Sequence, residues 1–453
     1  MQLGAKRVLV FGAAKSGVSA ARLLQKQEAR VILYDANYEL KLEDFKEKLD
    51  VKHNFQLITG ELTDDMTDCL DLVILSPGVP DDLPEVNKFK EKGIPIWGEI
   101  ELAYRNSRGK IIGITGTNGK TTTTSLVGEI MKAYYKDIYV VGNIGNPFTD
   151  IALKTTEDTV IVAEISSFQL ETIDEFRPEI SAILNISQEH LNRHHTMEAY
   201  IDLKVSITKN QARNDLCILN YEDEILRKIG ERLNTKVMYF SSERPLDRGI
   251  FIEDNIIYYK DEDKEQRVCS TGELKILGKH NYENVMAAIG IAVTAGVPME
   301  CIIETVTSFQ AVEHRIEFVE TIGGVTYYND SKGTNPDASI KAVKAMSSPT
   351  ILIGGGYDKG LEFDDWINSF DGKVKCMVLL GQTREKIAET AKKHGFDNII
   401  LVNSLEEAVK ISAKKAVYGD AVLLSPACAS WGMFDNYEKR GRLFKEYVRR
   451  MVD

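Results

Sequence analysis

The feature that most constrains the fold of this chain is a regular alternation of short apolar runs with segments of helical periodicity. Runs such as RVLVFG, RVILYD and LDLVILSPG are rich in β-branched residues, and segments with helical spacing of apolar residues follow them. This alternation is typical of βαβ units around a parallel sheet. It predicts an α/β protein and argues against a coiled coil, a collagen-like chain or a disordered chain.

The length of the chain divides this pattern into three predicted domains. At about 150 residues per domain, 453 residues suggest three units that each bury their own core. A polar, glycine-bearing segment at 105–109 precedes a fresh apolar strand, and a third series of strands and helices follows His314 and Arg315. We therefore expect domains at 1–107, 108–313 and 314–453. The charged, hairpin-like stretch 241–277 is expected at the periphery of the central domain.

Composition narrows the classes of partner and the cellular compartment. Lys and Arg number 56 against 68 Asp and Glu, and the net charge of -12 opposes binding to nucleic acid or to an anionic membrane. The six cysteines are scattered without a C-x-x-C pair, which indicates reduced thiols rather than a disulfide framework. No apolar run reaches the ~18 residues of a membrane span, and the N-terminus lacks a signal-peptide pattern. We expect a cytoplasmic protein with no membrane insertion.

The segment GITGTNGKTTTTSLVGEIM carries the strongest local signal. An apolar strand ends in a glycine-rich turn, and a helix then opens with a lysine and four threonines. Gly116 and Gly119 allow backbone N–H groups to converge on an anion, which the helix dipole also attracts. Lys120 is expected to meet the β- and γ-phosphates, and Thr121 to ligate Mg²⁺. The first glycine of the strict G-x-x-x-x-G-K-[ST] pattern would fall at Ile114, so only the TGTNGKTT part is present.

A nucleotide site also needs groups that hold its metal ion. Glu164 ends the apolar run VIVAE, and strand ends are where open α/β sheets bind ligands. His190 and His194 are four residues apart, but the glutamate of an H-E-x-x-H zinc motif and a third ligand are missing, so a place beside phosphate or Mg²⁺ is preferred for His190. Lys204 lies on the apolar face of a predicted helix. It is either a snorkelling side chain or a desolvated amine with a lowered pKa that is open to modification.

Nine separated motifs resemble those of the Mur ligase family, over essentially the whole chain. In order they are TGTNGKTT, GNIGNP, EISSFQLE, EHLNRH, the helix with Lys204, GKHNYENVMAA, EHRIE, NDSKGTNPDA and SPACASW. The resemblance implies a Rossmann-like N-terminal domain for a uridine nucleotide, a P-loop ATPase-type central domain and a Rossmann-like C-terminal domain for an amino acid. It also implies an ATP-dependent carbon–nitrogen ligase of cytoplasmic peptidoglycan precursor synthesis. Such an enzyme adds D-glutamate to UDP-N-acetylmuramoyl-L-alanine through an acyl phosphate.

The resemblance implies roles for individual residues as well. The expected catalytic residues are Lys120, His190 and Lys204. Two Mg²⁺ ions are expected on Thr121, Glu164, His190 and a carbamylated Lys204. ATP is expected to bind Gly116, Thr117, Asn118, Gly119, Lys120, Thr121, Thr122, Asn281, Asn284, Arg315 and Asp330. The substrates are expected to bind Lys15, Ser16, Asp35, Ser76, Pro77, Gly78, Asn143, His190, Lys332, Thr334, Lys359, Ser430 and Tyr437.

Three other interpretations stay open on the sequence. GAAKSG with Asp35 imitates a dinucleotide fingerprint whose middle glycine is Ala14, so a nicotinamide-dependent dehydrogenase is one alternative. A P-loop switch protein that binds ATP without ligation is another. Folate polyglutamate synthases share the ligase chemistry but lack a nucleotide-sugar domain ahead of the phosphate loop, where this chain has 115 residues. We expect ATP and two Mg²⁺ ions as cofactors, the two small-molecule substrates as partners, and a monomer.

Overall fold

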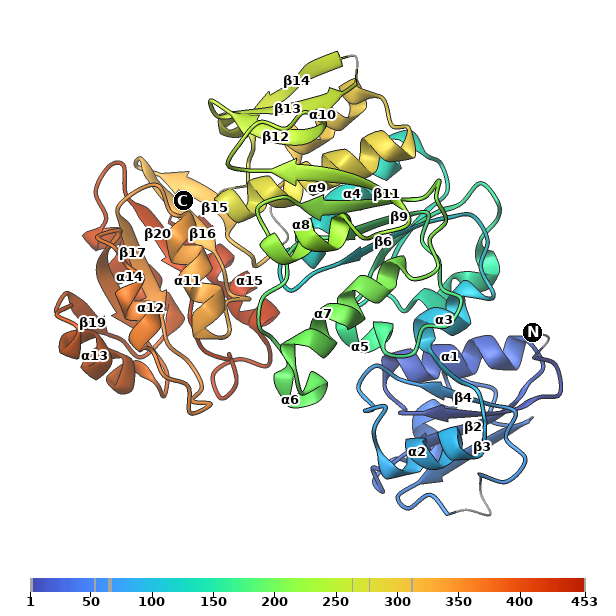
Figure 1. Cartoon of the computed structure of the whole chain (residues 1–453). Coiled ribbons are helices and arrows are strands. Elements are labelled where there is room, and N and C mark those ends of the chain that lie inside the picture. The colour runs from blue at the N-terminus through green and yellow to red at the C-terminus, as the bar shows by residue number, and fades with distance from the viewer. Residues whose placement is uncertain are drawn as a thin grey trace. The chain divides into compact units, whose positions relative to one another are not determined.

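The computed structural model describes residues 3–52, 54–63, 67–262, 264–276, 278–310 and 313–451. It confirms the predicted α/β class, with three sheets flanked by helices (Figure 1). The chain forms two compact units, one of Met1–Cys269 with Glu283–Val306 and one of Ser270–Tyr282 with Thr307–Asp453. The first unit contains two of the sheets and the second contains the third. The exact domain boundaries at 107/108 and 313/314 stay predictions.

The N-terminal sheet is parallel throughout. Its strands are β1 (Arg7–Phe11), β2 (Arg30–Asp35), β3 (Phe55–Thr59), β4 (Leu72–Leu75) and β5 (Ile96–Gly98), and its helices are α1 (Lys15–Lys26), α2 (Pro84–Glu91) and α3 (Glu99–Tyr104). The strand order is β3-β2-β1-β4-β5. From β1 the chain first adds strands on one side of the sheet (β2, β3) and then on the other (β4, β5), and such sheets bind ligands at this switch point. Val8 and Val10 face one core and Leu9 and Phe11 the other, because successive side chains alternate across a strand. Burial on both faces explains the continuous apolar run.

The central sheet has nine strands. They are β6 (Lys110–Thr115), β7 (Ile138–Gly142), β8 (Val160–Glu164), β9 (Ile180–Ile183), β10 (Leu216–Asn220), β11 (Lys236–Ser241), β12 (Gly249–Glu253), β13 (Ile256–Asp261) and β14 (Lys264–Ser270). The helices along this part of the chain are α4 (Lys120–Tyr134), α5 (Ser167–Leu170), α6 (Leu191–His194), α7 (Met197–Val205), α8 (Glu224–Gly230), α9 (Lys279–Ala295) and α10 (Met299–Ser308).

The order of the central sheet places the candidate site. It runs β14-β13-β12-β11-β10-β9-β6-β8-β7, and β6 pairs in parallel with both β8 and β9. The carboxyl ends of these three strands therefore lie side by side. This arrangement brings the phosphate loop and Glu164 to the same end of the sheet. Towards the far edge, β12 and β13 form an antiparallel hairpin, as predicted for this part of the stretch 241–277. Residues 270–277 belong to the second unit and not to the central domain.

The C-terminal sheet is parallel except for its first strand. Its strands are β15 (Glu317–Ile322), β16 (Val325–Asn329), β17 (Thr350–Gly354), β18 (Val374–Leu379), β19 (Ile399–Leu401) and β20 (Ala421–Leu424). Its helices are α11 (Pro336–Ala345), α12 (Asp364–Asn368), α13 (Arg384–Lys393), α14 (Leu405–Lys415) and α15 (Tyr437–Arg449). The order is β15-β16-β20-β17-β18-β19, with β15 antiparallel to β16. The loops that leave β16 and β20 consequently emerge as neighbours.

Two buried glutamates of α3 join the N-terminal sheet to the central domain. Glu101 accepts hydrogen bonds from the backbone N–H groups of residues 174–176, and its Oε1 lies 2.6 Å from Arg105 Nε. Glu99 Oε1 accepts hydrogen bonds from the N–H and the hydroxyl of Thr149, at 2.7 and 2.8 Å. Glu99 Oε2 is buried without a hydrogen-bond partner in the described part of the chain. Glu99 therefore binds Thr149 through Oε1, while its Oε2 is shielded from water and has no bonding partner among the described residues.

This desolvation predicts a pH-dependent stability. Burial raises the pKa of Glu99 from 4.5 to about 7, so the folded protein binds this proton more tightly than the unfolded chain. The stabilising contribution of the protonated group is full below its unfolded pKa of 4.5 and is lost as the pH rises to about 7. We expect Glu99→Gln to match the wild type near pH 4, whereas near pH 8 the free energy of unfolding of the variant should be about 3 kcal/mol higher than that of the wild type.

Denaturant titrations of the two proteins at the two pH values measure this difference. Glu47→Gln, at an exposed carboxylate of the same domain, is the control and should differ from wild type equally at both pH values. A Glu99→Gln difference that does not change with pH would contradict the assignment.

Candidate active site

The turn between β6 and α4 is the candidate phosphate-binding loop. Gly116 and Gly119 have φ angles of 148° and 85°, which residues with a side chain rarely adopt. A Cβ on Gly119 would lie 2.1 Å from Asn284 Oδ1. Glycine is therefore needed here for its conformation and for the close approach of Asn284, a predicted ATP ligand. The helix α4 starts at Lys120, with Thr121 and Thr122 following in its first turn, and the positive end of a helix dipole attracts an anion.

Two lysine ammonium groups donate to the same carbonyl of this loop. Lys120 Nζ lies 2.9 Å from both Gly116 O and Thr117 O, and Lys204 Nζ lies 2.9 Å from Gly116 O. Lys204 is only 1% exposed, with Nζ 4.6 Å from the ring centroid of Tyr200. Burial, and next the positive charge of Lys120, lower the pKa of Lys204 to about 7. The snorkelling interpretation of Lys204 is wrong, and the desolvated amine is the correct one.

The carboxylate of Glu164 is suited to hold a cation. It ends β8, is 1% exposed, and accepts a hydrogen bond from Asn143 Nδ2 at 2.7 Å through Oε1. Its Oε2 is buried without a hydrogen-bond partner among the described residues. A buried anionic oxygen without a partner is costly, and an oxygen-binding cation such as Mg²⁺ would satisfy it. Among the described residues, no three His, Cys, Asp or Glu side chains form a cluster that could hold a metal ion.

The two histidines differ in environment although they are four residues apart. His190 is exposed and precedes α6 with a φ of 55°, and its ring lies 4.8 Å from that of Phe168. His194 is buried, with Nε2 3.0 Å from Ser167 Oγ and Nδ1 3.4 Å from Glu171 Oε1. Burial lowers the pKa of His194 to about 4. Because His190 lies outside the helix, the spacing does not create a shared helical face.

Asn185 is a loop-positioning residue that sequence reasoning did not select. Its Oδ1 accepts from the N–H of Asn118 at 2.8 Å, and its Nδ2 donates to the carbonyl of Asn118 at 3.1 Å. The hydroxyl of Thr117 also lies 3.0 Å from that of Tyr200 and 3.1 Å from Ser187 O. A signal was present, since Asn185 follows the apolar run ISAIL just as Glu164 ends VIVAE.

The predicted nucleotide-sugar residues gather at the switch point of the N-terminal sheet. Asp35 Oδ2 accepts from the N–H of Ala13 at 2.8 Å, and Ser76 Oγ donates to Gly12 O at 3.0 Å. Lys15, exposed at the start of α1, donates to Gly145 O at 2.6 Å. Ser16 is the second residue of α1, and Pro77 and Gly78 follow β4. Asp35 and Ser76 thus support the turn, and their contact with a nucleotide stays a prediction.

Three of the predicted ATP-binding residues belong to the second unit. Asp330 is buried, accepts from Ser425 Oγ at 2.7 Å, and has its pKa raised to about 7 by burial. Arg315 has a buried Nε without a hydrogen-bond partner in the described structure, which leaves a donor for a ligand. Asn281 is buried in the first turn of α9 within this unit.

The predicted amino-acid residues also belong to this unit. Lys332 Nζ lies 5.8 Å from the ring centroid of Tyr437, and Lys359 Nζ lies 4.5 Å from that of Trp431, which are cation–π distances. Thr334 follows in the loop after β16, and Ser430 is buried in the loop after β20. Trp431 was not selected from the sequence.

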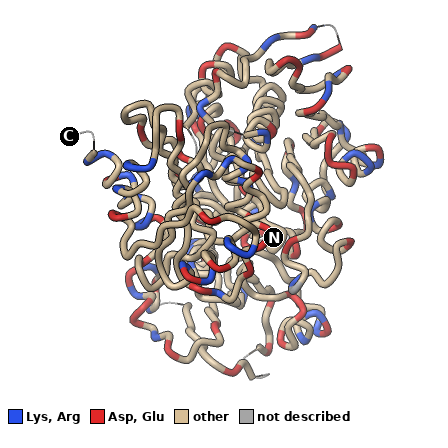
Figure 2. Tube along the Cα trace, turned by 90° about the vertical axis from the view of Figure 1, so that its left-hand side faces the viewer, with Lys and Arg blue, Asp and Glu red and all other residues tan. Residues whose placement is uncertain are grey.

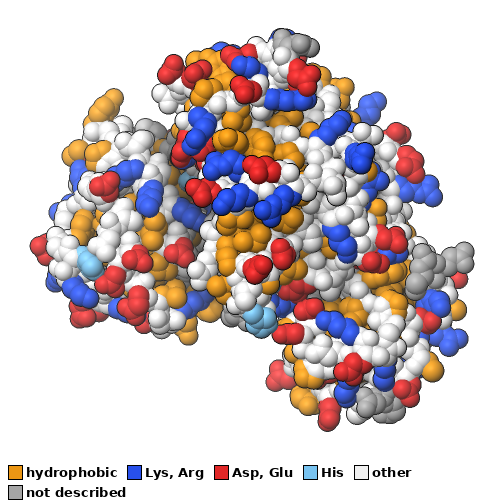
Figure 3. Space-filling view, in the orientation of Figure 1, with side chains coloured by type: hydrophobic (Ala, Val, Ile, Leu, Met, Phe, Trp, Pro, Cys, Tyr) orange, Lys and Arg blue, Asp and Glu red, His pale blue; other side chains and the backbone are white. Residues whose placement is uncertain are grey.

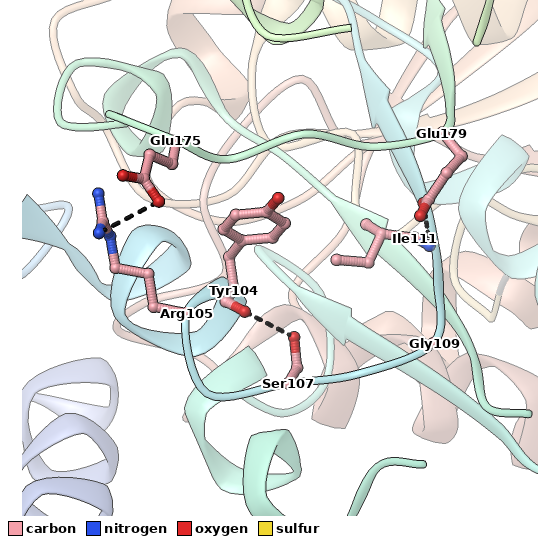
Figure 4. Close-up of a pocket in the computed structure, with 7 residues that line it drawn as sticks. All are labelled: Tyr104, Arg105, Ser107, Gly109, Ile111, Glu175 and Glu179. Carbon is pink, nitrogen blue, oxygen red and sulfur yellow. Dashed lines mark hydrogen bonds and ion pairs between the residues drawn. The ribbon is translucent and has the colours of Figure 1, made fainter. Parts of the chain in front are cut away.

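A cavity of about 360 Å³ lies elsewhere, where α3 connects to β6 (Figure 4). None of the predicted site residues lines it. Arg105 Nη1 lies 3.2 Å from Glu175 Oε2, and Glu179 Oε2 accepts from the N–H of Ile111 at 2.7 Å. The polar groups of these residues thus bond to one another. We therefore interpret the cavity as part of the contact between the N-terminal and central sheets.

The charge on the protein surface is mixed, so an anion would have to be bound by local loops. Acidic and basic residues are scattered along the chain (Figure 2), and both kinds occur on the face shown in Figure 3. Such a surface, with a net charge of -12, offers little long-range attraction to phosphate. All six cysteines are free, as predicted. Within the described ranges, no helix combines the length and apolar character needed to cross a membrane.

Comparisons with known proteins agree with this geometry. Family models match in order along the chain: the Mur ligase MurD-like N-terminal domain at 6–98, the Mur ligase middle domain at 114–292 and the Mur ligase glutamate ligase domain at 314–428. The UDP-N-acetylmuramoylalanine--D-glutamate ligase of Lachnoclostridium phytofermentans is 60% identical over 448 residues, 99% of each chain. The protein of the same name from Clostridioides difficile is 48% identical over 452 residues, 100% of each chain.

A solved structure shows the same fold. The UDP-N-acetylmuramate-alanine ligase of Thermotoga maritima superposes with a TM-score of 0.60 at 18% identity, over 98% of this chain and 99% of that one. Three family models in order, and close identity to relatives over the full length, lead to one conclusion. The chain belongs to the Mur ligase family.

Proposed function

We propose that this chain is an ATP-dependent ligase that joins D-glutamate to UDP-N-acetylmuramoyl-L-alanine in peptidoglycan precursor synthesis. One observation supports the proposal most strongly. The glycine-rich loop after β6 is bonded to the buried Lys204, and the adjacent strand β8 ends in Glu164, whose buried Oε2 has no partner among the described residues. The close relatives, identical at 60% and 48% over their whole length, are named for this reaction.

The reaction consists of two transfers. The acceptor carboxylate attacks the γ-phosphorus of ATP, which forms a carboxyl–phosphate bond and releases ADP. The amine of D-glutamate then attacks the carbonyl carbon, forms the amide and expels phosphate, with loss of an amine proton. Both steps concentrate negative charge, so the N–H groups of the loop and the ammonium of Lys120 stabilise them by preorganised electrostatics.

We assign two Mg²⁺ ions to this site. Thr121 and Glu164 would hold one ion, since Glu164 Oε2 is buried and lacks a partner among the described residues. His190 and a carbamylated Lys204 would hold the second. When bound, Mg²⁺ supplies neutralisation of the phosphate and carboxylate charge.

Carbamylation of Lys204 explains an otherwise unfavourable arrangement. Two ammonium groups, those of Lys120 and Lys204, donate to the one carbonyl of Gly116. The unprotonated amine of Lys204 adds to the carbon of CO₂, forms an N–C bond and releases a proton, which gives an anionic carbamate. This change removes the repulsion between two cations and supplies oxygen ligands to a metal ion.

The two outer domains would hold the substrates. We assign the nucleotide sugar to the switch point of the N-terminal sheet and D-glutamate to the loops after β16 and β20. We further propose a monomer that acts in the cytoplasm, an environment that its six free cysteines suit.

The central prediction is a strict dependence on both substrates. Phosphate release from ATP should require UDP-N-acetylmuramoyl-L-alanine and D-glutamate together, because the acyl phosphate forms on one and is consumed by the other. A coupled phosphate assay measures this dependence. With the acceptor present, we expect turnover with D-Glu and none with L-Glu, L-Ala or L-Lys. Equal turnover without the acceptor would indicate an ATP-hydrolysing switch, and NADH formation would indicate a dehydrogenase.

Removing the loop lysine should affect the transition state more than ATP binding. For Lys120→Ala we expect kcat to fall about a hundredfold or more, whereas KM for ATP rises by a much smaller factor. Steady-state kinetics with ATP as the varied substrate separates the two. Lys132→Ala, on the exposed face of the same helix, is the control. A variant in which only KM for ATP changes would refute this role.

Lys204→Ala should abolish ligation because it removes the amine that carries the carbamate. Short carboxylates at millimolar concentration should partly restore activity, since they can occupy the position of the lost carbamate oxygens. Lys209→Ala, at a lysine five residues further on, should stay active and show no response to carboxylates. Full activity of Lys204→Ala would reduce this residue to a packing role.

A further inference from the structure

The helix α15 carries a buried arginine to which neither the proposed reaction nor the sequence assigns a role. Arg440 is 2% exposed and shares the buried face of α15 with Phe444 and Val448, at intervals of four residues. Burial lowers the pKa of Arg440 to about 10, so the group is still charged at neutral pH. A charged group is retained at such a position only when its donors are satisfied.

The donors of Arg440 reach two loops of the same sheet. Nε donates to Ser331 Oγ at 3.0 Å and Nη2 to Ser331 O at 2.8 Å, whereas Nη1 donates to Cys428 O at 3.1 Å. Ser331 lies in the loop after β16 (residues 330–335), and Cys428 lies in the loop after β20 (residues 425–436). The guanidinium therefore bridges the two neighbouring strand ends.

These contacts are made to uncharged groups. No ion pair within 4.0 Å joins Arg440 to a carboxylate in the described ranges of the chain, although the charge of Asp330 acts on its pKa. Two of its three acceptors are backbone carbonyls. An arginine that serves a surface ion pair would instead be exposed and bonded to a carboxylate. The bonding pattern is that of a group that holds backbone segments in place.

The loop after β20 needs such support. Ala427 has a φ of 56°, in the left-handed region that a residue with a Cβ adopts only when its surroundings impose it. Its N–H donates to Ser339 Oγ at 2.9 Å, and the carbonyl of Ala429 accepts from the N–H of Tyr357 at 2.9 Å. The bond from Arg440 to Cys428 O lies between these two contacts.

The same two loops carry the residues assigned to the amino acid. Lys332 directly follows Ser331, and Ser430 lies two residues after Cys428. Ser331 Oγ also donates to the carbonyl of Tyr437 at 2.8 Å, at the first residue of α15. A shift of Arg440 would consequently move groups from both loops and from the start of the helix.

We propose that Arg440 is a positioning residue that holds the loops after β16 and β20 together and thereby sets the geometry of the amino-acid subsite. The description of that subsite rests on the proposed function. The planar guanidinium spans both loops with donors in fixed directions, whereas a lysine ammonium presents one nitrogen and cannot occupy all three positions. The role is therefore one of geometry as well as charge.

Kinetics of three variants test the proposal. For Arg440→Met and Arg440→Lys we expect KM for D-glutamate to rise between about tenfold and about a hundredfold, with KM for the nucleotide sugar within about twofold of wild type. Arg442→Met, at an arginine on another face of the same helix, should behave as wild type. An unchanged KM for D-glutamate in Arg440→Met, or full recovery in Arg440→Lys, would overturn the proposal.

Hydrogen exchange on the full chain supplies a readout that does not depend on catalysis. Without substrates, backbone amides in both loops should exchange about tenfold faster in the Arg440 variants, while those of β17 and β18 keep their protection. Unchanged loop exchange overturns the positioning role even if the protein is a ligase. Faster loop exchange in a protein that forms no amide supports the role of Arg440 and refutes the proposed function instead.

A milder variant keeps the test available if Arg440→Met does not fold. Ser331→Ala removes one of the three acceptors and leaves the two carbonyls bonded. We expect a smaller rise in KM for D-glutamate than in Arg440→Lys, with faster exchange concentrated in the loop after β16. Wild-type kinetics together with wild-type exchange in both Ser331→Ala and Arg440→Lys would contradict the proposal.

Discussion

The carbonyl oxygen of Gly116 is the point on which the candidate site depends. It accepts hydrogen bonds from Lys120 on α4 and from Lys204 on α7, and it belongs to a turn whose glycines adopt positive φ angles. The ammonium of Lys120 and the start of α4 thereby meet at one turn in a protein of net charge -12. Because the surface as a whole does not attract phosphate, this local positive charge has to do so.

The sequence located buried charged side chains where a residue type conflicts with a local pattern. Glu164 ends a strand that is otherwise apolar, and Lys204 occupies an apolar position of a helix, so the amino-acid order alone is enough to single out both. Arg440 carries the same signal, since it shares a face with Phe444 and Val448, but it was not among the predicted site residues. A charge at the apolar position of an amphipathic element is thus the transferable signal.

Prediction was weaker where the outcome depends on where a helix begins and ends. His190 and His194 have helical spacing, but His190 adopts a left-handed conformation before α6. The contact between Asn185 and Asn118 joins segments 67 residues apart, and only the strand order β8-β6-β9 brings such segments together.

Hydrogen bonds within the first unit connect the switch point of the N-terminal sheet to the carboxylate of the central sheet. Lys15, at the start of α1, donates to Gly145 O, and Asn143 in the same short segment donates to Glu164. Glu99 holds Thr149 a few residues further along. The segment 142–149 is therefore bound on one side by the domain assigned to the nucleotide sugar and on the other by the carboxylate assigned to Mg²⁺.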